Sequence, residues 1–245
     1  ELKEIGYQML LANAYHLYLR PGSELIQKMG GLHKFINWEK PILTDSGGFQ
    51  VYSLAVLRKI NDEGVEFQSH IDGSRHFFSA EKVMEIQESL GSDIIMPLDD
   101  CPALPAGHRR LLESVKHTVS WAGRSKEKKA REDQTLFGII QGGIDLELRK
   151  KCFNELYQIG FSGYALGGLA VGEDPKTRAE IVEAMSEVLP EDQPRYLMGV
   201  GPIEECLEAV RSGMDLFDCV QPTRNARNGQ LFGSQGKIVI KNAQY

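Results

Sequence analysis

One pattern recurs along the chain and limits the folds that it can adopt. A short apolar run ends in a glycine or a polar residue, and a segment with helical spacing of apolar residues follows. Such runs are typical of strands that are buried on both faces. Strands that alternate with helices predict a parallel α/β sheet. The seven candidate strands lie near 8–11, 42–43, 94–98, 136–140, 164–166, 196–198 and 216–217.

The segments between the runs carry helix signals of their own. Asp145 is placed to cap a helix that ends just before Gly160, and Asp174 precedes a proline at a first helical position. Eight strand–helix units would close a (β/α)8 barrel. Because we count seven strands and the chain opens on a helix-like ELKEIG, we predict a single TIM-barrel domain over 1–245 that lacks its first strand.

The pattern changes between about residues 57 and 80. The stretch VEFQSHIDGSRHFF alternates around Asp72 and Gly73, a dipeptide that favours a tight turn between paired strands. We therefore predict a β-hairpin inserted into the barrel at about 57–80.

Composition excludes several classes of protein. The net charge of −6 gives no overall basic signature, although a local basic patch would suffice for RNA. No apolar run is long enough for a membrane span, and the N-terminal residues lack the layout of a signal peptide. Cys101, Cys152, Cys206 and Cys219 form no C-x-x-C pair. Scattered cysteines of this kind fit a reducing, cytoplasmic setting and predict neither a disulfide framework nor a metal site within this chain.

Polar residues stand at the ends of the predicted strands, where barrel enzymes place their chemistry. An isolated acid there commonly caps a helix. Three acids, Asp45, Asp99 and Asp218, are harder to explain in that way, because neighbouring buried carboxylates repel one another. The glycine pairs at the rim can be plain turns, or they can admit a flat ligand close to the backbone. Phe49 and Met198 could cover such a ligand or belong to the core.

The segment PTRNARNG follows Asp218 almost at once. Arg224, Asn225 and Arg227 offer donors for phosphates and base edges, which makes them candidate nucleic-acid-binding residues. A solvated loop is the ordinary alternative for two arginines, and the position next to Asp218 favours the RNA interpretation.

Five motifs in order, TDSGGFQ, GIIQGG, GGLAVGE, YLMGVG and FDCVQPTRNARNG, resemble the tRNA-guanine transglycosylase (queuine tRNA-ribosyltransferase) family over nearly the whole chain. The resemblance implies an irregular (β/α)8 barrel that acts in queuosine biosynthesis. Members replace the wobble guanine of certain tRNAs with a 7-deazaguanine through a covalent ribosyl–aspartate intermediate. By this resemblance Asp218 is the nucleophile, Asp45 the general acid and base, and Asp99 the acid that reads the guanine edge.

Further pocket residues follow from the same motifs. Gln141 and the Gly168 backbone would bind the carbonyl oxygen of the base, while Phe49 and Met198 would sandwich its ring. The remaining substrate-binding residues implied by the resemblance are Ser46, Gln50, Leu169 and Val171.

The resemblance also implies partners and a metal. Family members carry a C-terminal structural zinc subdomain with three cysteines and one histidine, and this chain stops at KNAQY before that point, so no zinc ligand is expected within it. The chemistry itself needs no cofactor, and a homodimer is expected for the full-length enzyme. Cys101 and Val171 resemble the bacterial type that takes 7-aminomethyl-7-deazaguanine, whereas Asp100 is partly eukaryote-like, so queuine stays open as the acceptor base.

Two other functions use the same residues. A glycoside hydrolase could employ the carboxylates with water, although such a site would favour more exposed aromatic residues. A non-catalytic partner subunit of the same fold is the second alternative. It would be expected to have lost part of the acid set, and Asp45, Asp99 and Asp218 are all present.

Overall fold

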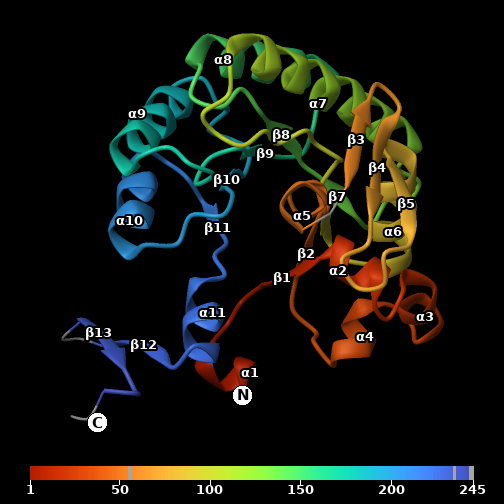
Figure 1. Ribbon diagram of the computed structural model, residues 1–245, viewed down its shortest axis with the longest axis vertical. Coiled ribbons are helices and arrows are strands. Elements are labelled where there is room, and N and C mark those ends of the chain that lie inside the picture. The colour runs from red at the N-terminus through yellow and green to blue at the C-terminus, as the bar shows by residue number, and fades with distance from the viewer. Residues whose placement is uncertain (55–56, 234–235, 243–245) are drawn as a thin grey trace.

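The predicted strands form one curved arc of parallel β-structure (Figure 1). The computed structural model describes residues 1–54, 57–233 and 236–242. One four-stranded sheet has the order β1-β2-β6-β7 and the other β11-β10-β9-β8. The strands are β1 (Leu10–Asn13), β2 (Ile42–Asp45), β6 (Ile94–Ile95), β7 (Thr135–Leu136), β8 (Gly138–Ile140), β9 (Tyr164–Leu166), β10 (Arg195–Leu197) and β11 (Leu216–Phe217).

The two sheets meet within the single apolar run at 136–140. Phe137 separates β7 from β8; its N–H bonds the Ile95 carbonyl at 3.2 Å, whereas the Gly138 N–H bonds the Gly163 carbonyl at 2.9 Å. The chain therefore pairs with β6 before Phe137 and with β9 after it. As a result, the order of strands around the arc follows the order in the sequence.

Of the predicted (β/α)8 barrel without its first strand, the described residues show the parallel α/β part and no closed ring of strands. Within the residues that the structure describes, β1 pairs only with β2 and β11 only with β10, so the arc has two open ends (Figure 1). The first strand also begins later than predicted: Leu10 pairs with Ile42, and pairing continues to Asn13 and Asp45. The parallel α/β class is confirmed, whereas the barrel architecture and the missing first strand stay predictions.

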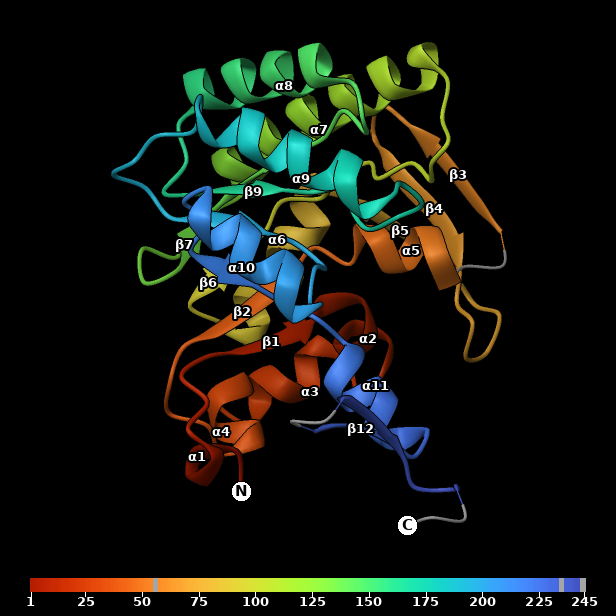
Figure 2. The same cartoon turned by 90° about the vertical axis from the view of Figure 1, so that its left-hand side faces the viewer.

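Five longer helices cover the outer side of the arc (Figures 1 and 2). The predicted caps are confirmed, because Asp145 accepts from the Leu148 N–H and Asp174 from the Thr177 N–H. These helices are α6 (Ala80–Leu90), α7 (His108–Lys128), α8 (Leu146–Ile159), α9 (Pro175–Ser186) and α10 (Ile203–Arg211). The short helices are α1 (Leu2–Ile5), α2 (Ala14–Leu19), α3 (Ser23–Lys28), α4 (Leu32–Ile36), α5 (Gly48–Leu54) and α11 (Gln221–Arg227).

The inserted segment is a three-stranded antiparallel sheet of β3 (Arg58–Asn61), β4 (Gly64–Gln68) and β5 (Arg75–Ser79). Its β4–β5 turn contains Gly73 at φ 75°, a conformation that glycine adopts without strain. The β3–β4 turn is held on α7, where the Trp121 indole N–H donates to the Asp62 carbonyl at 2.8 Å. A second antiparallel pair, β12 (Gln230–Gly233) and β13 (Gly236–Val239), follows α11.

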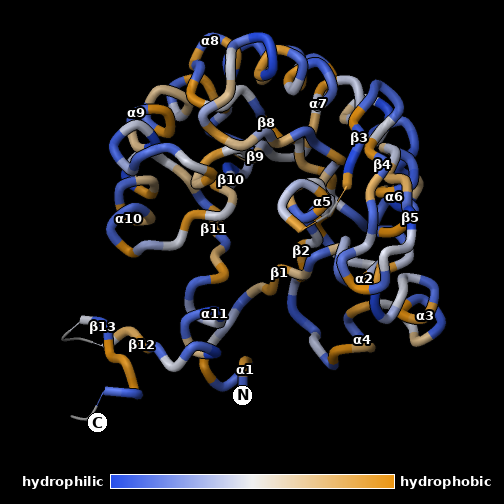
Figure 3. Tube along the Cα trace, in the orientation of Figure 1, coloured by the Kyte–Doolittle hydropathy of each residue, from blue (hydrophilic) through white to orange (hydrophobic). Residues whose placement is uncertain are grey.

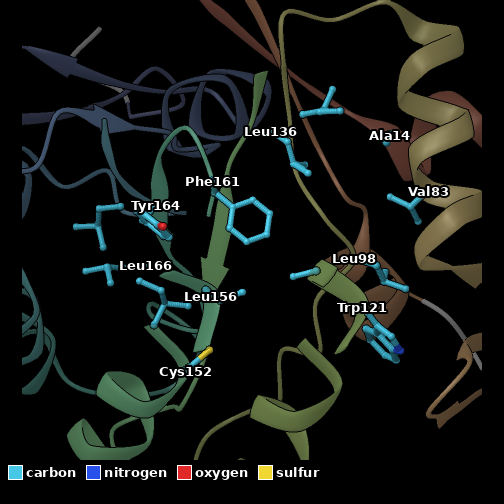
Figure 4. Close-up of a cluster of buried hydrophobic side chains, with 14 of the residues drawn as sticks. Ala14, Val83, Leu98, Trp121, Leu136, Cys152, Leu156, Phe161, Tyr164 and Leu166 are labelled. Carbon is cyan, nitrogen blue, oxygen red and sulfur yellow. The ribbon is translucent and has the colours of Figure 1, made fainter. Parts of the chain in front are cut away.

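The core lies between the strands and the outer helices (Figure 4). Figure 3 shows hydrophobic residues along the strands, while hydrophilic and hydrophobic residues alternate along the outer helices. Trp121 and Leu156 are fully buried there, which anchors α7 and α8 to the arc. None of the helices in the described part of the chain is long and apolar enough to cross a membrane.

Candidate active site

The three predicted carboxylates gather at the carboxyl ends of the strands. Asp45 is the last residue of β2 and pairs in register with Asn13 of β1. Asp99 lies beyond β6, and Asp218 directly follows β11. The negative charges of Asp218 and Asp99 both contribute to a raised pKa of Asp45, so both groups lie close enough to Asp45 to act on it.

Asp45 is tuned to titrate near neutral pH. Burial, and then the charges of Asp218 and Asp99, raise its pKa from 3.8 to about 7. Two hydrogen bonds oppose this shift: Asn13 Nδ2 donates to Oδ2 at 2.5 Å, and the Ala14 N–H donates to Oδ1 at 3.1 Å. A carboxyl group with such a pKa can both give and take a proton at neutral pH.

Asp99 is 8% exposed and bonds two polar side chains. Ser46 Oγ donates to Oδ1 at 3.0 Å, and Gln141 Nε2 donates to Oδ2 at 2.7 Å. Burial is the main cause that raises its pKa to about 6, so the group is mostly ionised at neutral pH. A Cβ at Gly48 would lie 2.7 Å from Oδ1, so the glycine allows the backbone to pass this close. The carboxylate keeps acceptor capacity for a ligand.

Gln141 packs directly against the turn after β9. Its side-chain amide occupies the space that a Cβ of Gly167 or Gly168 would need, and Gly168 has φ 62°. Gln141 is fully buried, and its Oε1 has no hydrogen-bond partner among the described residues. The amide therefore has hydrogen-bonding capacity beyond its bond to Asp99.

Asp218 is half-buried and is held through one oxygen. The Tyr196 hydroxyl donates to Oδ1 at 2.6 Å, and the Gly199 N–H donates to the same oxygen at 2.7 Å. Burial and the Asp218 charge raise the pKa of the Tyr196 phenol, which keeps it a donor. Neither of these two bonds involves Oδ2, so that oxygen can serve as a nucleophile.

The neighbouring acid Asp100 belongs to a different environment. Arg110 Nη1 and Nη2 donate to its two oxygens at 2.8 and 2.5 Å, and His117 Nδ1 lies 2.9 Å from Oδ2. Burial raises the Asp100 pKa, but hydrogen bonds from His117 and Arg110 outweigh it and leave the pKa below its ordinary value. Asp100 thus ties β6 to α7.

The other predicted pocket residues are spread over three segments. Phe49 is exposed and Gln50 half-buried on α5, and Met198 is half-buried just after β10. Leu169 is buried after β9, whereas Val171 is half-buried, with its N–H on Glu173 Oε2 at 3.1 Å. The predicted sandwich of a base between Phe49 and Met198 stays a prediction.

The arginine segment is a helix, α11, and not a loop. Arg224 and Arg227 are exposed on it and Asn225 is half-buried. The helix begins three residues after Asp218 and extends from the open end of the arc (Figure 1). The segment has no apolar stripe, so its sequence did not indicate a helix.

Two residues of this region were missed by the sequence analysis. Tyr196 lies within the apolar run of β10, so the sequence does not distinguish it from an ordinary core residue. Arg149 lies on α8 and is fully buried, on the same face as Cys152, Phe153 and Leu156. A charged residue on the apolar face of a helix was the signal that could have identified Arg149.

The described residues offer no site for the structural zinc that the family resemblance implies. In the segments that the structure describes, no three His, Cys, Asp or Glu side chains are grouped to hold a metal ion. Cys101, in the segment after β6, and Cys152, on α8, are buried free thiols, and burial raises the pKa of each thiol to about 12.

Comparison with known proteins gives one consistent result. The family model described as "Queuine tRNA-ribosyltransferase" matches residues 1–245. Proteins with that name from Thermoanaerobacter sp. (strain X514) and Halothermothrix orenii are each 56% identical over all of this chain, which covers 66% of either relative. One from Thermodesulfovibrio yellowstonii is 57% identical, with 64% of its length covered. The chain thus spans about two thirds of the length of the curated relatives that it matches.

Proposed function

The chain belongs to the queuine tRNA-ribosyltransferase family, and on that premise we propose that it exchanges a guanine of tRNA for a 7-deazaguanine base. The observation that carries the proposal is a set of three carboxylates beyond the carboxyl ends of β2, β6 and β11. Two of them act on the charge state of the third, and each has a different environment. Base exchange needs a nucleophile, a proton donor and acceptor, and an acceptor for the edge of the base. Asp218, Asp45 and Asp99 suit these roles in that order.

The first step is a displacement at the ribose. Asp218 Oδ2 attacks C1′ of the target nucleotide, the bond from C1′ to N9 of guanine breaks, and its electron pair leaves with the base. The product is a ribosyl ester of Asp218. The hydrogen bonds from Tyr196 and Gly199 to Oδ1 support this role, because they orient the other oxygen.

Proton transfer makes both halves of the exchange feasible. Guanine leaves readily only when it is protonated, and Asp45 supplies that proton. The incoming 7-deazaguanine gives a proton to the Asp45 carboxylate, and its N9 attacks C1′. The ester bond then breaks and the Asp218 carboxylate is restored. A pKa of about 7 lets Asp45 serve in both directions at neutral pH.

Recognition of the base rests on Asp99. Its ionised carboxylate accepts from the ring N–H and the exocyclic amine of guanine, and adenine lacks this pair of donors. A buried acceptor left without a partner costs ~1–3 kcal/mol, which favours guanine. Gln141 and the Gly168 N–H donate to the carbonyl oxygen of the base. Ser46 and Gln50 complete this side of the pocket, with Phe49 and Met198 on the two faces of the ring.

The rest of the proposal concerns the larger substrate and the full-length enzyme. Leu169 and Val171 line the region of the 7-substituent, and Arg224, Asn225 and Arg227 hold the anticodon stem-loop. For the full-length protein we propose a closed (β/α)8 barrel, a C-terminal structural zinc, a homodimer and a cytoplasmic location. These four expectations rest on the family resemblance.

The test is incorporation of labelled guanine into bulk tRNA by the full-length protein, with queuine and 7-aminomethyl-7-deazaguanine as competitors. We expect incorporation, competition by at least one deazaguanine, and a protein–RNA adduct that survives denaturant. Absence of incorporation would overturn the proposal. Release of free guanine without incorporation would instead support the hydrolase alternative.

A further inference from the structure

Arg149 links the carboxyl ends of β8 and β9 through hydrogen bonds to backbone carbonyls. Its guanidinium is fully buried and donates to four backbone carbonyls. Nε reaches the Gly143 carbonyl at 2.6 Å and Nη1 the Ile140 carbonyl at 3.3 Å. Nη2 reaches the carbonyls of Gly167 at 3.0 Å and Gly168 at 3.3 Å. One side chain thus fixes the turn after β8 relative to the turn after β9.

This cation is held without a salt bridge. Among the described residues, no carboxylate lies within ion-pairing distance of Arg149, which leaves carbonyl dipoles as its partners. Burial lowers its pKa to about 10, which still leaves the group charged at neutral pH. A buried charge costs stability unless its surroundings compensate it. A role in positioning or electrostatics would explain why a cation occupies this site.

The bonded carbonyls belong to the peptides that flank the proposed base-binding groups. The Gly167 carbonyl and the Gly168 N–H are the two ends of one peptide unit. A hydrogen bond to the oxygen of a peptide polarises it and strengthens the donor at its nitrogen. Within the described part of the chain we find no hydrogen bond donated by the Gly168 N–H, and the Gln141 amide packs against the same peptide.

We propose that Arg149 is a positioning residue that aligns Gln141 with Gly168 and transmits its positive charge through the Gly167–Gly168 peptide to the carbonyl oxygen of the bound base. This inference rests on the proposed function. When the bond from C1′ to N9 breaks, negative charge spreads onto that oxygen. A strengthened donor aimed at it stabilises the transition state more than the ground state.

Arg195 offers a matched control. It is also a buried arginine, 8% exposed, and its Nε and Nη2 donate to the carbonyls of Pro190 at 2.9 Å and Leu189 at 2.5 Å. It is the first residue of β10, at the opposite end of the strands from the site. Its loss should affect folding to a similar extent, with no effect on the base.

The experiment compares Arg149→Lys, Arg149→Met and Arg195→Lys in the full-length enzyme. We expect kcat for guanine exchange to fall about tenfold in Arg149→Lys and about a hundredfold in Arg149→Met, while KM for tRNA stays near the wild-type value. Arg195→Lys should lower the unfolding midpoint and leave kcat within about twofold. Because Arg149→Met removes a buried partner of four carbonyls, Arg149→Lys decides the question if the Met variant does not fold.

A second measurement separates polarisation from general damage. In 6-thioguanine the carbonyl oxygen is replaced by sulfur, a weaker hydrogen-bond acceptor. Arg149→Lys should therefore reduce exchange of guanine more than exchange of 6-thioguanine. Equal losses for the two bases, or equal losses in Arg149→Lys and Arg195→Lys, would reduce Arg149 to a structural residue and overturn the inference. A wild-type enzyme that exchanges no guanine would instead overturn the proposed function, and the inference with it.

Discussion

The two sides of the candidate site differ in burial. On the side formed by β2, β6 and β8, Asp99 is 8% exposed and Gln141 is fully buried, in one network of hydrogen bonds. On the side formed by β11 and α11, Asp218 is half-buried and Arg224 is exposed. We refer to these as the base side and the RNA side.

This difference follows from what each side has to bind under the proposed function. A small flat base is distinguished by a few polar atoms, and such discrimination is strong only when those atoms are desolvated and fixed in advance. A folded RNA cannot enter a closed pocket, so its phosphates have to be met at the surface. Substitutions on the base side should therefore change base affinity and pH dependence. Those on the RNA side should change covalent chemistry and RNA binding.

The largest effect is expected on the RNA side, from Asp218→Asn. An amide is a very poor nucleophile at C1′, so exchange should fall by about ten-thousandfold or more and the covalent RNA adduct should disappear. Guanine affinity should stay near wild type, because the base side is intact. Gel analysis under denaturing conditions detects the adduct. Asp215→Asn, at the opposite end of β11, is the control, and an adduct that persists in Asp218→Asn would refute the nucleophile assignment.

The matching change on the base side is Asp99→Asn. It replaces an acceptor with a donor that faces the donors of guanine, so kcat/KM for guanine should fall by about a hundredfold or more. Binding of tRNA should change little. Calorimetry of free guanine and a filter-binding assay for tRNA separate the two, and a loss of tRNA affinity as large as that of guanine would break the distinction between the sides.

Asp99 and Asp100 should also differ in their effects on stability. The Asp99 pKa is raised from 3.8 to about 6, so its contribution to folding is present below pH 3.8 and is lost as the pH rises through about 6. The Asp100 pKa is lowered, so its contribution is present above 3.8 and is lost as the pH falls through the lowered value. At neutral pH, Asp99→Asn should therefore not decrease the free energy of unfolding, whereas Asp100→Asn should decrease it by about 3 kcal/mol.

The next prediction concerns the pH dependence of adduct formation. Adduct formation needs protonated Asp45, so its single-turnover rate should be level below pH 7 and fall about tenfold per unit above it. Asn13 donates to the ionised form and thereby lowers the pKa. Asn13→Ala should raise the pKa and move the alkaline fall to higher pH. The variant also loses the cap of α2, at a cost of about 1 kcal/mol, so its unfolding has to be checked. If the alkaline decrease in the rate of adduct formation keeps its pH or moves to lower pH in Asn13→Ala, the role of Asp45 is contradicted.

Much of the fold could be predicted because strands and caps are local features. The apolar runs located seven strands of the arc, the run at 136–140 being predicted as one strand where the structure has β7 and β8. Asp145 and Asp174 cap the helices expected of them. Closure could not be predicted in the same way, because pairing of a first and a last strand depends on residues far apart in the chain. The division of one run at Phe137 between two sheets is likewise a tertiary effect.

In the candidate site, the carboxylates could be predicted from their positions at the ends of apolar runs. The side chains that donate hydrogen bonds to them could not. Asp45 and Asp218 could be identified because polar residues interrupt an apolar pattern there. Tyr196 and Arg149 lie within apolar patterns, and only their placement in space reveals which atoms they bond. The α11 helix was missed because Pro222 and polar neighbours are equally typical of a loop.

The smallest effects are expected from the exposed arginines of the RNA side. Each of Arg224→Ala and Arg227→Ala should weaken tRNA binding a few-fold at physiological salt and reduce the slope of log affinity against log salt concentration by about one. The physical reason is that each phosphate contact releases about one counterion, and an exposed guanidinium makes that contact with little desolvation. Arg109, which is exposed on α7 and paired with Glu113, is the matched control, and Arg109→Ala should leave the slope unchanged. Because neither α11 arginine belongs to the base side, guanine affinity should stay constant in both variants. An unchanged salt slope in the two α11 variants would show that α11 does not contact the phosphates of the RNA. A loss of guanine affinity would mean that the base side and the RNA side are coupled through β11.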